Sequence, residues 1–171
     1  APGLGALGEP VAGQPARSCA APAWKVTESS LEVQDELQLE YCSDTRGQGP
    51  FLPVLGSRRF STPQIPSTLP TLDEILGLDG LTPEEANRRL LEGLREGINV
   101  HTFHAEMEGI GQIGLFEEFL LECKNMGVRF CTLGEIARFQ PKEKLPLCFL
   151  ETGEIPGRAG KVALQGKEWR P

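Results

Sequence analysis

Residues 82–104 read TPEEANRRLLEGLREGINVHTFH and carry the clearest secondary-structure signals in the chain. Thr82, Pro83 and Glu85 mark a helix start: a hydroxyl caps the helix, a proline takes its first position and a carboxylate completes a capping box. Apolar residues then recur at helical spacing until Gly97, a typical helix stop. The β-branched run at 98–104 follows, and we predict that it is a strand.

A second unit of the same kind, residues 115–133, reads LFEEFLLECKNMGVRFCTL. Leu115, Phe119 and Cys123 share one helix face, Gly127 closes the helix, and 128–133 is predicted to be a strand. Two helix-then-strand units in series are typical of a parallel α/β fold. Other expected elements are strands near 18–21 and 39–44, a helix capped by Ser29, a short helix starting at Thr71, a helical turn at 134–139, and a hairpin or irregular tail within 141–171.

The stretch from residue 47 to residue 70 is unusually rich in proline, with Pro50, Pro53, Pro63, Pro66 and Pro70. Proline lacks a backbone N–H and has a fixed φ, so this stretch is predicted to contain neither a long helix nor a central strand. Long loops that are stiffened by proline inside a domain are often functional. We therefore expect residues 50–70 to line a binding pocket.

Composition bounds the function. The 171 residues contain 17 Lys and Arg against 24 Asp and Glu, a net charge of −7, which argues against binding nucleic acid through phosphates. No apolar run approaches the roughly 18 residues of a membrane span, so any membrane contact is expected to be peripheral. The five cysteines form no C-x-x-C motif and are interpreted as reduced thiols of a cytoplasmic protein. The opening Ala residue and loose first segment indicate either a processed start or the interior of a longer protein.

The candidate chemistry centres on His101 and His104, the two histidines of the chain. On a strand, side chains three positions apart point to opposite faces, which disfavours a joint metal site. His104 stands at the carboxyl end of its predicted strand, where active groups of parallel α/β sheets gather, and it suits acid–base chemistry. Asp44 stands at another such end, beside Arg46. The alternatives are a hydrogen-bonded structural histidine and an aspartate that forms a turn.

Three segments together carry a resemblance: YCSDTRG at 41–47, TPQIP at 62–66 with TLPT at 68–71, and VHTFHAE at 100–106. They resemble the C-terminal part of the polysaccharide-deacetylase (NodB-like) superfamily, within it most closely the deformylases of undecaprenyl-phosphate-linked 4-formamido-arabinose. The flanks agree, because AAPAWK at 20–25 resembles an Ala/Gly-Trp-Arg segment of the family, and 128–135 and 153–160 resemble its later segments.

The resemblance implies that residues 1–140 are the C-terminal portion of a distorted (β/α) barrel of the NodB type. Enzymes of this kind hydrolyse an N-acyl group from an amino sugar, using a divalent metal, usually zinc, that activates water. A late-strand histidine protonates the leaving amine, and this general-acid role falls on His104. Asp44 falls near the pocket, where it is expected to tune His104. Substrate-binding roles are expected for four further residues, namely Arg46, Gln64, Trp24 and Glu106.

Departures from the family pattern matter as much as the matches. The family's metal site needs an early Asp and a His-x-x-x-His pair, and this sequence lacks that pair, so no metal ligand is assigned to it. We therefore expect a fragment that is inactive alone, from an enzyme of lipid A modification at the cytoplasmic face of the bacterial inner membrane. Lys25 replaces an expected arginine and loses a bidentate partner for a carboxylate. The alternatives are a non-catalytic module that binds carbohydrate or lipid phosphate, and a deacetylase of another amino sugar.

Overall fold

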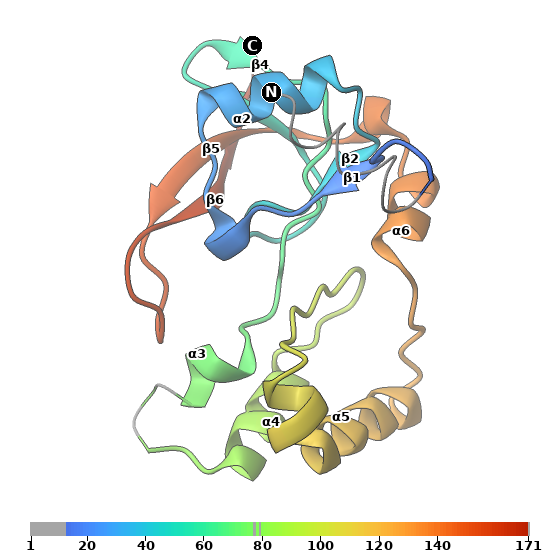
Figure 1. Ribbon diagram of the computed structural model, residues 1–171, viewed down its shortest axis with the longest axis vertical. Coiled ribbons are helices and arrows are strands. Elements are labelled where there is room, and N and C mark those ends of the chain that lie inside the picture. The colour runs from blue at the N-terminus through green and yellow to red at the C-terminus, as the bar shows by residue number, and fades with distance from the viewer. Residues whose placement is uncertain (1–12, 77, 79, 171) are drawn as a thin grey trace. The chain divides into compact units, whose positions relative to one another are not determined.

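The computed structural model describes residues 13–76, 78 and 80–170 (Figure 1). Most of the Gly/Ala/Pro-rich opening interpreted above, residues 1–12, lies outside this range. The chain divides into two compact units, each built from separate stretches of sequence. Unit 1 consists of Ala1–Pro66, Thr132–Gly153 and Val162–Pro171, and unit 2 of Ser67–Cys131 and Glu154–Lys161. No helix within the described ranges is long and apolar enough to cross a membrane.

The described residues of unit 1 form two small β-sheets. In the first, β1 (Ser18–Cys19) pairs in parallel with β2 (Tyr41–Cys42). The second has the order β4-β3-β5-β6, in which β3 and β5 are parallel and the other neighbours antiparallel. Its strands are β3 (Leu52–Leu55), β4 (Arg58–Arg59), β5 (Leu147–Gly153) and β6 (Val162–Glu168). Between residues 13 and 170, the helices of unit 1 are η1 (Pro22–Trp24), α2 (Glu28–Glu36), α6 (Leu133–Phe139) and η3 (Lys142–Lys144).

Strand β3 corrects the prediction that the proline-rich stretch holds no central strand. It lies between β4 and β5 although Pro53 is its second residue. The ladder tolerates this proline because successive residues of a strand turn their N–H groups to alternate sides. Leu52 donates its N–H to the Pro146 carbonyl on the β5 side, whereas the Pro53 carbonyl accepts from Phe60, just beyond β4. The N–H that proline lacks would face the short β3–β4 hairpin, so the β3–β5 pairing is intact.

Helix α2 begins two residues before its predicted start. Its cap is Thr27 rather than Ser29, and the side chains of Thr27 and Ser30 each accept from the other's backbone N–H. This hydroxyl pair satisfies the same helix-terminal donors as a Ser/Thr–Glu box, so several Ser/Thr positions in a row compete for the cap. The existence of the helix was predicted correctly, and only its first turn was misplaced.

Unit 2 is a cluster of helices: α3 (Leu72–Leu76), α4 (Pro83–Glu92), the π-helix η2 (Met107–Gly111) and α5 (Ile113–Asn125). The predicted capping box of α4 is confirmed, because Thr82 and Glu85 exchange both capping hydrogen bonds. Figure 1 shows α4 beside α5, and their apolar faces form one core with α3. The buried residues of this core are Leu72, Ile75, Ala86, Leu90, Phe119 and Cys123.

Two predicted strands are wrong: neither 98–104 nor 128–133 is a strand in the structure. The backbone at Val100 is instead bonded to a neighbouring loop, since its carbonyl accepts from Thr68 and Leu69 and its N–H donates to the Thr68 hydroxyl. β-Branched residues favour an extended backbone, but a ladder also needs a partner strand. The described residues form a mixed α/β structure without a closed barrel.

A partly buried ion pair joins the second segment of unit 2 to the first. Glu74 on α3 is 2% exposed, and its carboxylate lies 3.4 Å from the Arg158 guanidinium. Gly157 makes this approach possible, because it has φ +76° and a Cβ there would overlap the Glu74 carbonyl. Only glycine meets both demands, the left-handed conformation and the close backbone contact.

Candidate functional site

The Asp44 carboxylate is at the centre of a buried polar network in unit 1. Asp44 follows β2 and is 0% exposed. Its Oδ1 accepts from the Ala21 backbone N–H at 2.6 Å, and its Oδ2 accepts from the Gln34 amide at 2.6 Å and the Gln64 amide at 3.4 Å. Charged acceptors held by several N–H donors make strong hydrogen bonds. The network ties η1, α2 and the proline-rich stretch to the end of β2.

Burial raises the pKa of Asp44, and the three N–H hydrogen bonds oppose that rise. Desolvation disfavours the charged carboxylate, whereas donors aimed at its oxygens favour it. Gln64 is likewise 0% exposed, and its amide oxygen accepts from the Asp44 backbone N–H at 3.1 Å. Both functional atoms of the Gln64 amide thus serve the network. A substrate-binding role for Gln64 stays a prediction.

Arg46 and Trp24, two of the predicted binding residues, lie together in unit 1. The Arg46 guanidinium carbon stands 4.7 Å from the centroid of the buried Trp24 ring, a cation–π geometry. The loop that carries Arg46 is held by β6. The Arg46 backbone N–H donates to the Ala163 carbonyl, and the Gln165 side-chain oxygen accepts from the backbone N–H groups of Gln48 and Gly49. These contacts fix the backbone from which Arg46 projects.

Unit 1 also has a hollow of about 390 Å³ on another side of β1 and β2. Arg17 and Glu40, which precede these strands, line it together with Pro50, Pro63 and Ile65 of the proline-rich stretch. Asp44 and Arg46 follow β2 and do not line it. The hollow therefore lies at the amino ends of the two parallel strands, whereas active groups of parallel sheets gather at the carboxyl ends.

His104 lies in unit 2 at the end of the extended segment, just before η2. Its backbone N–H donates to the Glu108 carboxylate at 2.9 Å, and its carbonyl accepts from the N–H groups of Met107 and Glu108. Its imidazole Nδ1 is 3.7 Å from Asp73 Oδ1 on α3, with side chains 37% and 42% exposed. This separation is too long for a hydrogen bond but suits an ion pair with a protonated ring.

Three atoms around His104 are shielded from water and have no hydrogen-bond partner among the described residues: His104 Nδ1, Asp73 Oδ1 and Glu108 Oε1. Buried polar atoms are normally paired, so unpaired ones at one place merit a functional explanation. Glu106 is exposed two residues beyond His104. His101 has a different environment, with its ring 5.4 Å from the core ring of Phe119.

The predicted residues thus fall into two groups. Trp24, Asp44, Arg46 and Gln64 belong to unit 1, and His104 and Glu106 belong to unit 2. Tuning of His104 by Asp44 stays a prediction, because the structure describes each unit by itself.

The sequence did not predict a functional contact for Asp73 or Gln34. Asp73 was treated only as part of a helix start, and Gln34 as a residue of an ordinary helix. Neither has a local signal, because the partner of each is distant in sequence.

The resemblance implies a divalent metal, and one described group could offer three ligands: Cys19, Cys42 and Asp44, whose ligand atoms lie within 4.8 Å of one another. This group does not fit the expected metal. Both Asp44 oxygens already accept N–H hydrogen bonds, and the two free thiols are hydrogen-bonded to each other, with their sulfur atoms 3.2 Å apart. In a site built for a metal, the ligand atoms would be available to the ion. Here the ligand atoms of all three residues already make hydrogen bonds within the protein.

Comparison with solved structures shows which known fold this chain resembles. A Mycobacterium smegmatis protein, assigned as a polysaccharide deacetylase, superposes with a TM-score of 0.64 over 86% of this chain and 57% of its own, at 22% identity. The fold is therefore of the polysaccharide-deacetylase type. No protein-family model matches the chain.

Curated relatives define the group further. A Shewanella sediminis protein, named as a probable 4-deoxy-4-formamido-L-arabinose-phosphoundecaprenol deformylase ArnD, is 35% identical over 154 residues, 90% of this chain and 49% of its own length. A Wigglesworthia glossinidia brevipalpis protein of the same name is 35% identical over 158 residues, covering 90% and 54%. The chain is homologous to the ArnD deformylases and spans about half the length of the relatives it matches.

Proposed function

We propose that this chain carries the general acid of an enzyme that removes an N-acyl group from an amino sugar. The proposed substrate is undecaprenyl-phosphate-linked 4-formamido-arabinose, the compound that the names of both matched relatives specify. Use of this product in lipid A modification, at the cytoplasmic face of the bacterial inner membrane, is part of the same proposal.

The observation that supports this role is the environment of His104. Its imidazole is partly exposed, its backbone is held by Glu108, and its Nδ1 faces the Asp73 carboxylate at 3.7 Å. The imidazolium is the form that donates a proton, and the Asp73 carboxylate lies on the Nδ1 side of this ring. Histidine changes charge near neutral pH, so it can both donate and recover that proton.

The proposed step is the collapse of the tetrahedral intermediate. The bond between the formyl carbon and the sugar nitrogen breaks, and its electron pair moves to nitrogen. The imidazolium Nε2–H of His104 protonates that nitrogen, so a neutral amine leaves and a neutral imidazole remains. General-acid catalysis of this kind contributes roughly 10²–10⁴-fold to the rate. Addition of water is not assigned to any residue of this chain.

Direct substrate contacts are proposed for Arg46, which is partly exposed, and Glu106, which is exposed. The Arg46 guanidinium suits the phosphate of the lipid carrier, because its fork of N–H donors matches phosphate oxygens. Glu106 offers an acceptor for sugar hydroxyls. Trp24 is buried, and it is proposed to contribute to substrate binding by holding the Arg46 guanidinium over its ring. Gln64 is proposed to act indirectly, by holding Asp44.

The test uses a chimera in which this chain replaces its matching segment in the Shewanella sediminis relative. Formate release is measured from a prenyl-phosphate-linked 4-formamido-arabinose, with the acetamido analogue in parallel. The expected result is formate release that falls by about 10²–10⁴-fold in His104→Ala. His101→Phe is the matched control, because it keeps the ring packing on Phe119 and should retain activity.

Each outcome has a defined meaning. An unchanged rate in a folded His104→Ala chimera would refute the acid role. Faster release of acetate than of formate would identify a deacetylase instead. If the chimera releases neither acid but binds the lipid-linked sugar, the chain is a binding module.

A further inference from the structure

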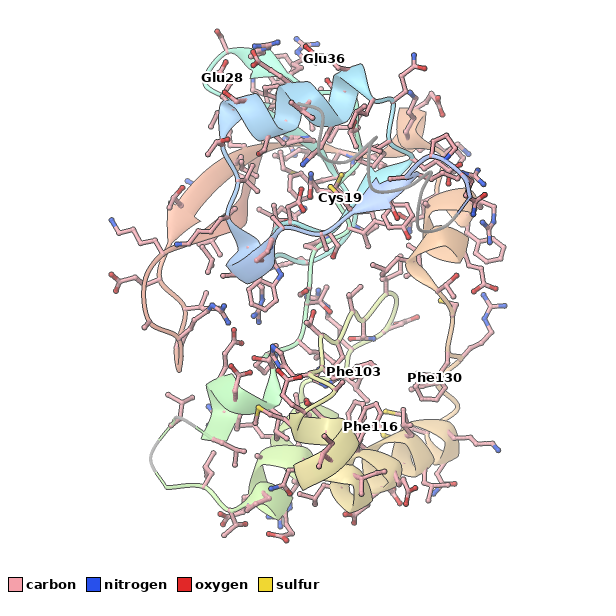
Figure 2. The ribbon with its side chains drawn as sticks, viewed as in Figure 1. Cys19, Glu28, Glu36, Phe103, Phe116 and Phe130 are labelled. Carbon is pink, nitrogen blue, oxygen red and sulfur yellow. The ribbon has the colours of Figure 1, made fainter. Side chains whose placement is uncertain are left out.

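Two thiols of unit 1 meet between adjacent strands. Cys19 on β1 and Cys42 on β2 are register partners in the parallel pair, and their sulfur atoms are 3.2 Å apart. Figure 2 shows the Cys19 sulfur on the strand of unit 1 that carries its label. Neighbouring strands lie about 4.8 Å apart, within the range of Cα separations that a disulfide spans. The two sulfurs can therefore bond without a change of strand register.

We propose that Cys19 and Cys42 are a redox-sensitive dithiol, in which Cys19 reacts first with a hydroperoxide and Cys42 converts the product into a disulfide. The difference in exposure assigns the two roles. Cys19 is partly exposed and can meet an oxidant, whereas Cys42 is 0% exposed and can meet only Cys19. Oxidisable cysteine sites commonly combine an accessible thiolate with an adjacent resolving thiol.

The hydrogen bond between the thiols supports this order of reaction. The two thiols share a hydrogen bond at 3.2 Å, and this bond lowers the pKa of Cys19. The same bond raises the pKa of Cys42, and burial and the Asp44 charge raise it further. Thiolate is the reactive form, so Cys19 is the better nucleophile of the two thiols.

The chemistry balances in two steps. The Cys19 thiolate attacks the terminal oxygen of the hydroperoxide, an S–O bond forms, the O–O bond breaks, and the leaving alkoxide or hydroxide takes up a proton. Cys42 then attacks the Cys19 sulfur: the S–S bond forms, the S–O bond breaks, and water leaves with the proton of the Cys42 thiol. The two thiols lose two electrons, and the hydroperoxide gains them.

The surroundings link this pair to the Asp44 network. The Cys19 carbonyl accepts from the Ser43 N–H, next to Asp44, and Ala21, two residues beyond Cys19, donates to the Asp44 carboxylate. A disulfide would lock β1 and β2 together immediately before these contacts. The other thiols lack such a partner: Cys131 is exposed, Cys123 is buried in the core of unit 2, and the Cys148 sulfur faces the Gln165 amide at 3.6 Å.

The test treats the reduced full chain with limiting hydrogen peroxide, followed by peptide mapping of the quenched protein. The expected product is an intramolecular Cys19–Cys42 disulfide, with the mass of two hydrogen atoms lost. In Cys42→Ser, Cys19 should instead accumulate as sulfenic acid, which a 1,3-dione reagent traps. Cys131→Ser is the control and should form the same disulfide as the wild type.

The wild-type map alone decides the main point, even if a serine variant fails to fold. Oxidation of Cys131 while Cys19 and Cys42 remain thiols would overturn the proposal. Disulfides formed only between two molecules would overturn it equally. Trapping of sulfenic acid at Cys42 rather than Cys19 would refute the assigned order.

Discussion

The two units treat their ionisable groups in opposite ways. In unit 1 the Asp44 carboxylate is fully buried, and N–H groups from three residues satisfy both of its oxygens. In unit 2 His104 and Asp73 are partly exposed, and the atoms that face each other lack hydrogen bonds in the described structure. A satisfied buried group stabilises one conformation, whereas an accessible and incompletely paired group can still exchange a proton with a substrate. The contrast indicates a framework role for Asp44, and it supports the proposal that His104 has a chemical role.

The largest expected effect comes from removing the centre of the Asp44 network. Asp44→Ala leaves the N–H donors of Ala21, Gln34 and Gln64 without their shared acceptor. We expect the free energy of unfolding to fall by about 3 kcal/mol or more. Urea unfolding measures this loss, with Asp73→Ala as the exposed counterpart, expected to lose under about 1 kcal/mol. Equal losses for both variants would remove the contrast between the units.

Gly47→Ala tests the loop that carries Arg46. A Cβ at this position would overlap the Gln165 side chain, which also holds Gln48 and Gly49. We expect a loss of roughly 1–3 kcal/mol, the usual cost of overpacking. Gly49→Ala is the matched control, because open space surrounds its Cβ position. Thermal unfolding of the two variants should differ, and a stable Gly47→Ala would show that the loop can shift freely.

The pH dependence of Asp44 gives a sharper test. Burial raises its pKa above the unfolded value of 3.8, so the charged form is the less stable one in the folded protein. The stability that this group contributes is complete below pH 3.8 and is lost as pH rises through the folded pKa. Relative to Asp44→Asn, the wild type should therefore gain stability as pH falls through that window. Paired urea titrations measure the difference, and a gain with rising pH would contradict the sign.

Asp73→Ala tests the partner of His104. The two side chains are partly exposed, and an ion pair of this kind is worth about 0.2–1 kcal/mol, less than tenfold in rate. In the chimera, formate release should fall by less than tenfold, whereas His104→Ala should cost far more. A high-salt buffer should reduce the Asp73 effect, because salt screens exposed charges. A loss as large as that of His104→Ala would give Asp73 a direct part in the chemistry.

An effect of similar size is expected at Arg46. Its contact with Trp24 at 4.7 Å is matched by Arg59 over Trp169 at 3.9 Å, the second Arg–Trp contact described. Arg46→Ala should cost about 0.5–1 kcal/mol and change the emission of Trp24. Arg59→Ala should act on Trp169 instead. In Trp169→Phe, only Arg46→Ala should still alter fluorescence, and insensitivity there would exclude the contact.

Local signals were sufficient for several elements of the fold. The Thr82–Glu85 capping box located α4, and helical periodicity located α5, because both depend on residues a few positions apart. The predicted strands at 98–104 and 128–133 failed, since a strand requires a partner that the local sequence does not encode. The prediction that the proline-rich stretch holds no central strand was also wrong, because Pro53 lies in β3. The side of the ladder to which its nitrogen points depends on the assembled sheet, which the local sequence does not show.

The candidate site was predictable to a similar extent. The resemblance located His104 and Asp44 by their motifs, yet the contacts that distinguish them could not be predicted. Gln34 and Asp73 meet their partners only through folding, as do Cys19 and Cys42. The metal-ligand pattern of the family was absent from the sequence, and the one described three-ligand group does not replace it.

The pairing of Glu74 with Arg158 limits how this protein can be divided. Unit 2 is not one continuous stretch of chain, because the segment that carries Arg158 and Gly157 returns to α3 after the chain has built β5 of unit 1. A shortened version that stops at Cys131 would keep the buried Glu74 carboxylate and lose its ion pair with the Arg158 guanidinium. Unit 2 can therefore be excised with this ion pair intact only if residues 154–161 are grafted back onto it.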